Sequence, residues 1–508
     1  MRSGILGEGQ YPMAMRRRTL MTCLLAVCVC MADAAELSVD FTQVVGRVKP
    51  ALHSASFGGQ LTGGYSAKAQ KILEPLHLHA ARTHDWALVN AGQRICDTHF
   101  VFPLQHKDPS DPSNYFFAPT DEILDRTINL LGMDVLYRMG TSIESVNGRR
   151  KGDKNPRYYN SVEPEDWDKY AGALEGIISH YTEGWANGYK WGDRMRYWEL
   201  WNEPNDRPGG SWIVKSQNPD PELNYNRFFD FFVYTLKRLK ARFPHLKFGG
   251  PAMCPPSETC FFDEKFMRGL LEKCRAAGYK PDFVSWHTYY HEPDLMIEQP
   301  AHMRRLCDEY GFKDTELFID EWHYIYALGK DFWGKSSPEA MAARVHPTTG
   351  LFGINSAIFT LQVLMGLQQT CLDQAYFYGC RYDGIWGIMK ENGSCNKVYY
   401  ALKTFGSAIA AGDRIVKSNG TKSARLFGVV SADGARKALI VSAFKCPAGT
   451  LEVAVKGLPA DVRAKTFFLD DKHDLTPVET VREGDVFKFV KADGHSAAWL
   501  VEFGDYLE

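Results

Sequence analysis

The chain has 508 residues, of which 45% are hydrophobic, 24% charged and 13% aromatic, and its 59 lysines and arginines nearly balance 61 aspartates and glutamates. These proportions are those of a globular protein and exclude a disordered, collagen-like or coiled-coil chain. The near-zero net charge provides no general field for a polyanion, so we expect no nucleic acid partner.

The first 34 residues have the pattern of a secretory signal. Three arginines at 16–18 precede an apolar run over residues 20–31, and a small-residue site follows at 32–34. Such a run is too short to span a bilayer and has the order of a signal peptide. We therefore predict a signal peptide over residues 1–34 and a mature protein that is secreted or periplasmic, without a membrane partner. A lipoprotein anchor at Cys28 is the alternative.

Three of the 12 cysteines lie in the predicted signal and nine follow it. Nine is odd, so at least one thiol stays outside any disulfide within the chain. Export permits disulfides, and Cys254 with Cys260 could close a short loop, but the sequence does not give the pairing. No C-x-x-C spacing suggests zinc or redox chemistry. His287 and His291 have a metal-like spacing without a completing Glu, so we predict no metal and no cofactor.

Short apolar runs alternate with longer segments of helical periodicity between residues 51 and 412. The runs predict strands at Leu52–Phe57, Ala80–His84, Asp134–Arg138, Arg196–Trp201, Lys247–Gly250, Phe283–His287, Leu317–Asp320 and Ala375–Cys380. The longer segments predict helices at Ala67–Leu76, Asp121–Leu131, Glu165–His180, Glu222–Phe243, Glu264–Ala277, Pro300–Gly311, Gly350–Leu367 and Lys397–Ala410. Eight strands, each followed by a helix, predict a (β/α)₈ barrel. A doubly wound open sheet is the rival, but the G-x-G-x-x-G turn often found early in such a sheet is missing.

The pattern changes after Asp413 to short segments of alternating hydrophobicity, separated by Gly, Asp and Pro turns. They predict antiparallel strands at Ser423–Val430, Lys437–Phe444, Thr450–Val455, Ala464–Leu469, Val486–Val490 and Ala497–Phe503. We therefore expect a barrel domain over residues 35–412 and a β-sandwich over residues 413–508. No flexible linker separates them, so the sandwich should pack on the barrel. The strand-like Leu37–Phe41, within residues 35–50, could join the sandwich.

Active sites of such barrels form at the C-terminal ends of the strands. The fourth predicted strand ends in the sequence Trp-Glu-Leu-Trp-Asn-Glu-Pro-Asn over residues 198–205, and Glu203 falls where the strand stops. Pro204 removes a backbone donor and ends the strand pairing, while the Asn202 amide can bond a sugar hydroxyl. The alternative is an acidic residue at an ordinary turn, which the flanking residues disfavour.

A second carboxylate follows the seventh predicted strand. Three apolar residues at 317–319 lead into Asp320 and Glu321, so Glu321 should lie at the barrel mouth. An isolated glutamate there would be a salt-bridge partner. Two glutamates on the fourth and seventh strands, on opposite sides of the barrel, instead suit glycoside cleavage, in which one protonates the leaving oxygen and the other attacks the anomeric carbon.

The Trp-Asn-Glu-Pro-Asn of residues 201–205, paired with Glu321, resembles the clan A glycoside hydrolases, which are retaining (β/α)₈ glycosidases with catalytic acids on strands four and seven. Within this clan the chain is most similar to glycoside hydrolase family 39, the β-xylosidase and α-L-iduronidase family. The resemblance covers the barrel and implies that Glu203 is the general acid/base and Glu321 the nucleophile. A retaining pair stands about 5–5.5 Å apart, and we expect the resulting repulsion to raise the pKa of the acid.

Other strand ends are expected to hold the sugar. The resemblance implies that Arg82 orients the nucleophile and keeps it ionised, and that His84 contacts the sugar. The sixth strand ends like the His-x-Tyr of the xylosidase branch, which implies that His287 lies near Glu203 and the Tyr289 hydroxyl near Glu321. The other predicted binding and mouth residues are Asn202, Trp201, Trp286, Trp322, Asp383 and Trp386. Trp386 could equally serve packing.

The favoured function is a secreted retaining glycosidase with β-xylosidase-like specificity. The iduronidase branch presents a lysine two residues after the histidine of the sixth strand, whereas this chain has Tyr289, which disfavours a uronic acid. Another glycone (an arabinoside, a galactoside or an iduronide) or endo-action on a polysaccharide stays open, as does the oligomeric state. A non-catalytic carbohydrate-binding barrel is the alternative of another class, and the presence of both carboxylates counts against it. A serine esterase is disfavoured because no G-x-S-x-G elbow is present.

Overall fold

The computed structural model describes residues 37–56, 66–84, 95–140, 142–143, 162–205, 212, 221–256, 258–259, 261–333, 337–381, 386–390 and 392–504. The predicted signal peptide, Cys260 and Asp383 lie outside these ranges. No helix within them combines the length and the apolar character needed to cross a bilayer.

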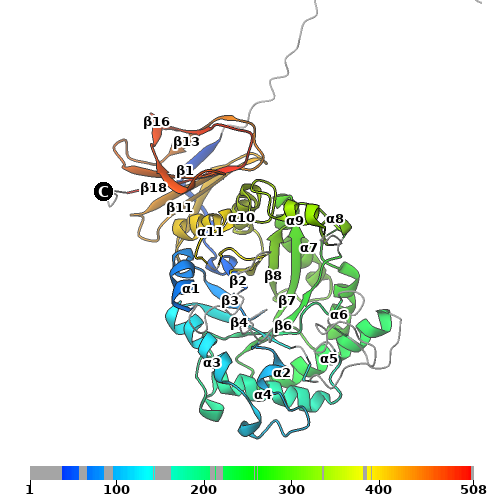
Figure 1. Ribbon diagram of the computed structural model, residues 1–508. Coiled ribbons are helices and arrows are strands. Elements are labelled where there is room, and N and C mark those ends of the chain that lie inside the picture. Colours follow the sequence, from blue (N-terminus) through cyan, green and yellow to red (C-terminus); the bar gives the residue numbers. More distant parts are fainter. Residues whose placement is uncertain are drawn as a thin grey trace, which may run out of the picture. The chain divides into compact units, whose positions relative to one another are not determined.

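Eight parallel strands close into a barrel, in the order in which they occur along the chain (Figure 1). They are β2 (Ser54–Ser56), β3 (Ala80–Arg82), β4 (Asp134–Met139), β5 (Tyr197–Leu200), β6 (Lys247–Met253), β7 (Phe283–Tyr290), β8 (Glu316–Tyr324) and β9 (Gln374–Tyr378). Each coincides with a predicted run, so the predicted (β/α)₈ barrel is confirmed. Side chains fill its interior below the site, where the rings of Phe283 and Phe318 stack with centroids 4.4 Å apart.

Helices surround the barrel (Figure 1). They are α1 (Ser66–Leu73), α3 (Ala118–Asp125), α4 (Trp167–Thr182), α5 (Pro221–Arg242), α6 (Glu264–Ala276), α7 (Pro293–Glu309), α10 (Ile354–Leu367) and α11 (Lys397–Ala408). One predicted start is wrong, since α7 begins at Pro293 rather than Pro300. Proline suits the first turn of a helix, where its missing N–H has no partner to lose. The sequence offers two such prolines, and Pro300 lies inside the helix.

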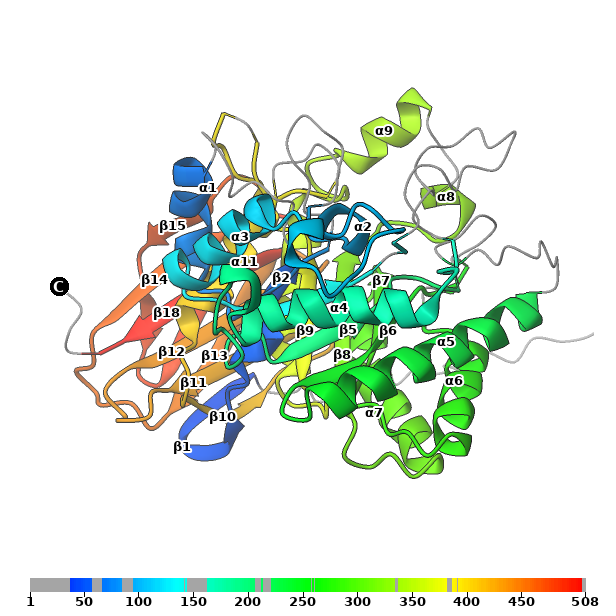
Figure 2. The ribbon, with the colours of Figure 1, turned by 90° about the horizontal axis from the view of Figure 1, so that it is seen from below.

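Short helices occupy several of the connections. They are α2 (Thr98–Val101), α8 (Lys330–Trp333), α9 (Pro338–Arg344), the 3₁₀ turns at Pro50–Leu52, Glu74–Leu76, Pro112–Asn114 and Trp185–Asn187, and a π-helical turn at Arg126–Leu130. The connections after β3 and β8 carry α2, α8 and α9, which lie on the same side of the barrel in Figure 2. In a (β/α)₈ barrel the segments that follow strands form the C-terminal face. These helices therefore border the mouth.

A second sheet has ten strands in the order β15-β14-β18-β12-β11-β10-β1-β13-β17-β16. They are β1 (Ser38–Arg47), β10 (Arg414–Asn419), β11 (Ala424–Val430), β12 (Lys437–Ala443), β13 (Gly449–Lys456), β14 (Ala464–Leu469), β15 (Asp474–Val478), β16 (Val481–Glu483), β17 (Val486–Lys491) and β18 (Ala497–Phe503). The strand near the N-terminus, β1, thus lies in this sheet, antiparallel to β10 and parallel to β13. All other neighbouring strands are antiparallel.

The ten-stranded sheet folds over itself into a sandwich. Phe41 of β1 and Phe487 of β17 both contact the ring of Phe503 on β18, with centroids 5.7 and 5.5 Å apart, although neither strand neighbours β18 in the sheet. The sandwich also shares a core with the barrel, because buried Leu469 and Leu500 belong to the apolar cluster that includes α10 and α11. The two domains therefore pack on each other through a shared apolar core.

Candidate active site

The backbone after β5 turns Glu203 over the barrel mouth. Trp201 and Glu203 have φ angles of 77° and 49°, in the left-handed region that residues other than glycine seldom adopt. The Trp201 N–H donates to the Met139 carbonyl at 2.8 Å and the Glu203 N–H to the Ala252 carbonyl at 2.9 Å, so β4 and β6 hold this turn. Such strain clusters at functional sites. The Glu203 side chain is 24% exposed and can reach a ligand.

A bulge in β8 directs two consecutive carboxylates into the barrel. Trp286 of β7 pairs with Ile319, but the next residue of β7 pairs with Glu321, so Asp320 is an extra residue in β8. Side chains alternate along a regular strand, and the extra residue lets Asp320 and Glu321 face the same side. Both contact the Arg82 guanidinium, at 3.1 and 3.3 Å.

The bulge also turns Trp322 away from the mouth. Its side chain is completely buried and its ring packs on Phe377, with centroids 5.3 Å apart. The predicted contact between Trp322 and the sugar is therefore wrong, because this side chain has no surface to offer.

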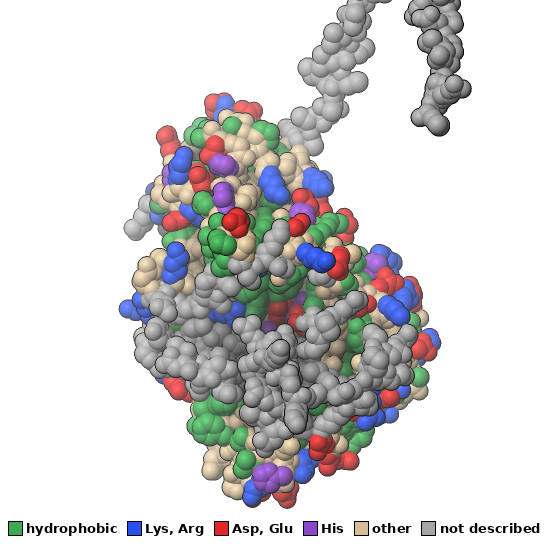
Figure 3. Space-filling view, turned by 45° about the vertical axis from the view of Figure 1, so that its right-hand side comes forward, with side chains coloured by type: hydrophobic (Ala, Val, Ile, Leu, Met, Phe, Trp, Pro, Cys, Tyr) green, Lys and Arg blue, Asp and Glu red, His purple; other side chains and the backbone are tan. Residues whose placement is uncertain are grey.

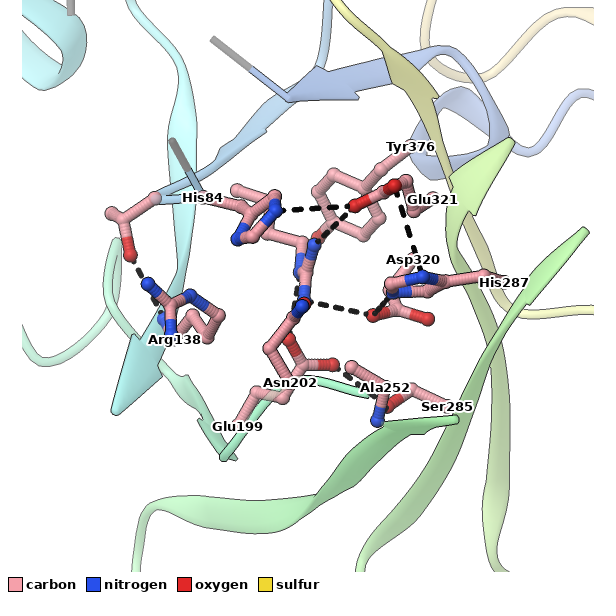
Figure 4. Close-up of polar contacts among 12 residues, drawn as sticks. His84, Arg138, Glu199, Asn202, Ala252, Ser285, His287, Asp320, Glu321 and Tyr376 are labelled. Atoms are coloured by element: carbon pink, nitrogen blue, oxygen red, sulfur yellow. Dashed lines mark hydrogen bonds and ion pairs between the residues drawn. The ribbon is translucent and has the colours of Figure 1, made fainter. Parts of the chain in front are cut away.

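Three side chains contact the Glu321 carboxylate. The Tyr289 hydroxyl donates to Oε1, and the Arg82 guanidinium lies 3.3 Å from Oε2. Nε2 of His84 lies 3.5 Å from the same oxygen (Figure 4). Burial is the strongest influence on this group and raises the pKa of Glu321 above its ordinary value, while His287, Arg82 and Tyr289 oppose that rise. The predicted position of the Tyr289 hydroxyl beside Glu321 is confirmed.

His287 joins the two glutamates. Its Nδ1 lies 2.8 Å from Oε1 of Glu203 and 3.7 Å from Oε1 of Glu321, so its predicted position near Glu203 is confirmed. One carboxylate oxygen of Glu203 and one of Glu321 lie within 4.8 Å of each other. This distance fits the spacing of about 5–5.5 Å in retaining glycosidases and is shorter than the spacing of about 6.5–9.5 Å that separates the carboxyl groups of inverting enzymes.

The pKa of Glu203 differs from the sequence-based expectation. Burial raises this pKa, but the hydrogen bond and the charge of His287 outweigh burial and hold it below its ordinary value. Burial in turn lowers the pKa of His287, but the charges of Glu321 and Asp320 raise it well above normal. The direction of the pKa of Glu203 therefore differs from the rise expected from the sequence, because that expectation left out the imidazole.

A buried layer supports this pair from below. Arg82 Nε donates to Glu199 at 2.7 Å and its Nη2 to the Asn202 side chain at 2.8 Å, while the Ser285 hydroxyl donates to Glu199 at 2.7 Å. Burial, aided by the charge of Asp320, raises the pKa of Glu199 to about 7 against the opposing effects of Arg82 and Ser285.

Sequence reasoning missed Glu199, Ser285 and Asp320. The sequence feature that could have identified Glu199 is an acidic residue inside an otherwise apolar strand. Such a residue needs a positively charged partner when it is buried. Tyr197 and Glu199 are two residues apart and share one face of β5. The Tyr197 ring packs on Phe318 inside the barrel, which places Glu199 on the inward face as well.

Aromatic side chains form one wall of the mouth. The Trp386 ring lies 5.7 Å from that of Tyr289 and 5.8 Å from that of Tyr378. Trp333 of α8 stacks on Trp386 with centroids 6.0 Å apart, and it is 44% exposed. Sequence reasoning missed Trp333 because it lies in a long connection, 12 residues after Glu321. Figure 3 shows a recess over the barrel with acidic side chains inside it and apolar ones at its border.

Trp201 and Trp286 were expected at the mouth, but neither lines it. Trp201 is buried against Trp212 and Phe231, with centroids 5.2 and 5.7 Å apart. Trp286 is buried and its Nε1 donates to Gln299 at 3.1 Å. Both rings pack between the barrel and its helices, because they occupy outward positions of their strands.

Two groups of side chains in the described ranges bring possible metal ligands within 4.8 Å of one another. One comprises Glu203, Glu321 and His287, and the other comprises Asp471, Asp493 and His495 in loops of the sandwich. His291 belongs to neither group. Its ring stacks on Tyr290 with centroids 4.7 Å apart.

Comparison with known proteins agrees with this geometry. The sequence profile of glycosyl hydrolases family 39 matches residues 31–362. A β-xylosidase of Geobacillus stearothermophilus is 28% identical over 198 residues, which cover 35% of each protein, so the chain spans about a third of the length of this curated relative.

Solved structures share the fold. A glucosidase from Croceicoccus marinus has a TM-score of 0.68 at 21% identity and covers 92% of this chain and 99% of its own. A monomeric β-xylosidase from Caulobacter crescentus has a TM-score of 0.66 at 16% identity and covers 93% of this chain and 100% of its own. An α-L-arabinofuranosidase from Thermotoga petrophila has a TM-score of 0.59 at 14% identity, with 92% and 100% covered.

Proposed function

Because the chain belongs to glycosyl hydrolases family 39, we propose that it is an exported retaining glycosidase with β-xylosidase-like specificity. The observation that carries the proposal is the pair of glutamates whose carboxylate oxygens lie within 4.8 Å. A non-catalytic carbohydrate-binding barrel has no need for two carboxylates at this spacing, because repulsion between them costs stability.

The contacts assign different tasks to the two glutamates. Glu321 receives Arg82, Tyr289 and His84, which favour the ionised form that attacks the anomeric carbon. Glu203 is more exposed and bonds His287, which suits the group that gives a proton to the leaving oxygen. The sugar then forms an ester with Glu321, and Glu203 takes a proton from the water that releases it.

A neutral sugar fits the charges of the site better than a uronate. The Arg82 guanidinium already contacts the carboxylates of Glu199, Asp320 and Glu321 at 3.3 Å or less. Tyr289 stands where the iduronidase branch presents a lysine. The similarity to a β-xylosidase of Geobacillus stearothermophilus favours a xyloside among neutral sugars.

Export follows from the sequence pattern of residues 1–34. Expression of the full chain in a bacterial host, fractionation, and N-terminal mass spectrometry test it. We expect a periplasmic or secreted product that begins near residue 35, and a cytoplasmic product with an intact N-terminus would contradict export.

A panel of aryl xylosides, arabinosides, galactosides and iduronides tests the substrate class. We expect the xyloside to be cleaved fastest, with NMR showing that the first product retains the anomeric configuration. Glu321→Gln should abolish turnover, and Glu203→Gln should keep activity only on substrates with a good leaving group. Retained hydrolysis in Glu321→Gln, or cleavage of iduronides alone, would refute the assignment. Binding of xylo-oligosaccharides without turnover of any glycoside would favour the carbohydrate-binding alternative.

A further inference from the structure

The His287 imidazole lies between two carboxylates. Its Nδ1 is 2.8 Å from Oε1 of Glu203. Its Nε2 is 3.3 Å from Oδ2 of Asp320 (Figure 4). Both His287 and Asp320 are completely buried. By hydrogen-bond geometry, neither Nε2 nor either Asp320 oxygen has a partner among the described residues, so the 3.3 Å contact between them is an ion pair. Asp320 and Glu203 therefore contact different nitrogens of the His287 ring.

We propose that Asp320 acts as a positioning residue that makes His287 a proton relay for Glu203. This inference rests on the proposed glycosidase function and names a residue of that site. Asp320 holds a proton on Nε2, so Nδ1 is the nitrogen that shares a proton with Glu203. A carboxylate that fixes the tautomer of a catalytic histidine has the same task in the Ser-His-Asp triad.

The proton balance of the step is simple. In the free enzyme the Nδ1 proton lies in the hydrogen bond between His287 and Glu203. When the glycosidic bond breaks, the Nδ1 proton passes to Glu203 and from there to the leaving oxygen, which leaves Glu203 ionised and a neutral imidazole whose Nε2–H faces Asp320. When water attacks the glycosyl ester, its proton passes to Glu203 and back to Nδ1, while the Glu321 carboxylate leaves the sugar.

The other groups around His287 agree with this direction of transfer. Oε1 of Glu321 lies 3.7 Å from Nδ1, farther than Glu203, and its charge disappears when it forms the ester. Loss of that charge weakens the hold of the site on the imidazolium proton during the step that needs it. Arg82 contacts the Asp320 carboxylate at 3.1 Å, and Cys254, in the connection after β6, hydrogen-bonds Glu203. Both contacts are made to the carboxylates, so neither competes for the protons of the imidazole.

Asp320→Asn tests the relay, because it keeps the shape and removes the charge. For an alkyl glycoside, which needs protonation of its leaving group, we expect kcat/KM to fall about 10- to 100-fold, within the range that general acid catalysis supplies. For a 2,4-dinitrophenyl glycoside, which leaves without a proton, the fall should stay below about threefold. The basic limb of the pH profile should move to lower pH. Equal losses on both substrates, or an unmoved basic limb, would overturn the proposal.

Glu199→Gln is the matched control. Glu199 is the other buried carboxylate on Arg82, at 2.7 Å from Nε. It also interacts with Asp320, for which glutamine keeps a donor, and no described contact joins it to His287. If Asp320 acted only through Arg82 and the nucleophile, both variants would impair both substrates alike. We expect Glu199→Gln to show no preference between the two leaving groups, and a preference equal to that of Asp320→Asn would refute the relay.

An NMR measurement reads the relay without turnover. In protein labelled with ¹⁵N at its 15 histidines, His287→Gln identifies the His287 signals by their loss. We expect the parent imidazole to stay doubly protonated well above its usual pH range and to titrate at least about one pH unit lower in Asp320→Asn. An unchanged titration would overturn the proposal. If Asp320→Asn does not fold, His287→Gln must show the same leaving-group preference. A parent with the expected titration but no glycosidase activity would refute the proposed function and leave the hydrogen-bond assignment standing.

Discussion

Removing the Tyr289 hydroxyl should move the acidic limb of the pH profile to higher pH. The hydroxyl donates to Oε1 of Glu321, and the side chain is buried, so water does not readily replace it. A hydrogen bond to a charged group contributes about 1.5–3 kcal/mol, which equals about one to two pKa units. Because the bond favours the ionised form, Tyr289→Phe raises the pKa of Glu321, and the nucleophile becomes protonated at a higher pH.

Arg82 and His84 still contact Glu321 in the variant, so we expect a shift near the lower value of about one unit. The assay is kcat/KM for a 4-nitrophenyl glycoside between about pH 4 and pH 9. The basic limb should stay where it is, since it belongs to Glu203 and His287.

Tyr290→Phe provides the matched control. It makes the same chemical change on the next residue of β7, where side chains alternate and the Tyr290 ring stacks on His291 instead. Both limbs should match the parent in this variant. An acidic limb in Tyr289→Phe that coincides with the parent would show that the hydroxyl does not stabilise the ionised nucleophile.

Three further predictions concern binding and stability. Trp333→Ala should raise KM about 2- to 12-fold with little change in kcat, since a ring contact contributes about 0.5–1.5 kcal/mol. Met341→Ala on α9 is the control. An equal KM in both variants would contradict a role of Trp333 in binding. Glu199 has a pKa raised to about 7, so its native form binds a proton that the unfolded chain releases, and stability falls as pH rises from about 4.5 to 7. In urea unfolding, the parent should lose on the order of 3 kcal/mol of unfolding free energy between about pH 5 and pH 8, and Glu199→Gln should not show this loss. The same pH dependence in both proteins would refute this explanation. Leu469→Ala should lower stability by about 2–5 kcal/mol in one transition that includes both domains, because Leu469 is fully buried in their shared core. Exposed Val490→Ala is its control, and separate transitions for the two domains would contradict the shared core.

The alternation of strands and helices was enough to predict the barrel because every unit repeats the same local pattern. Elements were missed where the pattern was too short or too exposed to stand out. β16 has three residues, none of them buried, and β15 alternates exposed and half-buried positions without a buried one. Such strands exist only because β14 and β17 pair with them. Pairing of this kind is a property of the folded sheet, so no single segment reports it.

The site divides in the same way. Glu203 and Tyr289 could be predicted because each belongs to a short motif at the end of a strand. Glu199 could not be assigned a partner, since the Arg82 that binds it lies 117 residues earlier in the chain. A buried carboxylate acquires its role from the charges that the fold brings to it, and these charges determine its pKa.

The phase of β8, meaning which of its side chains point into the barrel and which point out, explains why Trp322 was misplaced and Asp320 overlooked. Phe318 packs on Phe283 inside the barrel, so a regular strand would point Asp320 and Trp322 inward and Glu321 outward. Both phases are consistent with the local sequence, since apolar residues lie on either face. Only the pairing with β7 and β9, which shifts after Ile319, reverses the phase. A shift of one residue moves every following side chain to the other face, and here it brings Glu321, the proposed nucleophile, and Asp320 to the same side, where both lie near His287.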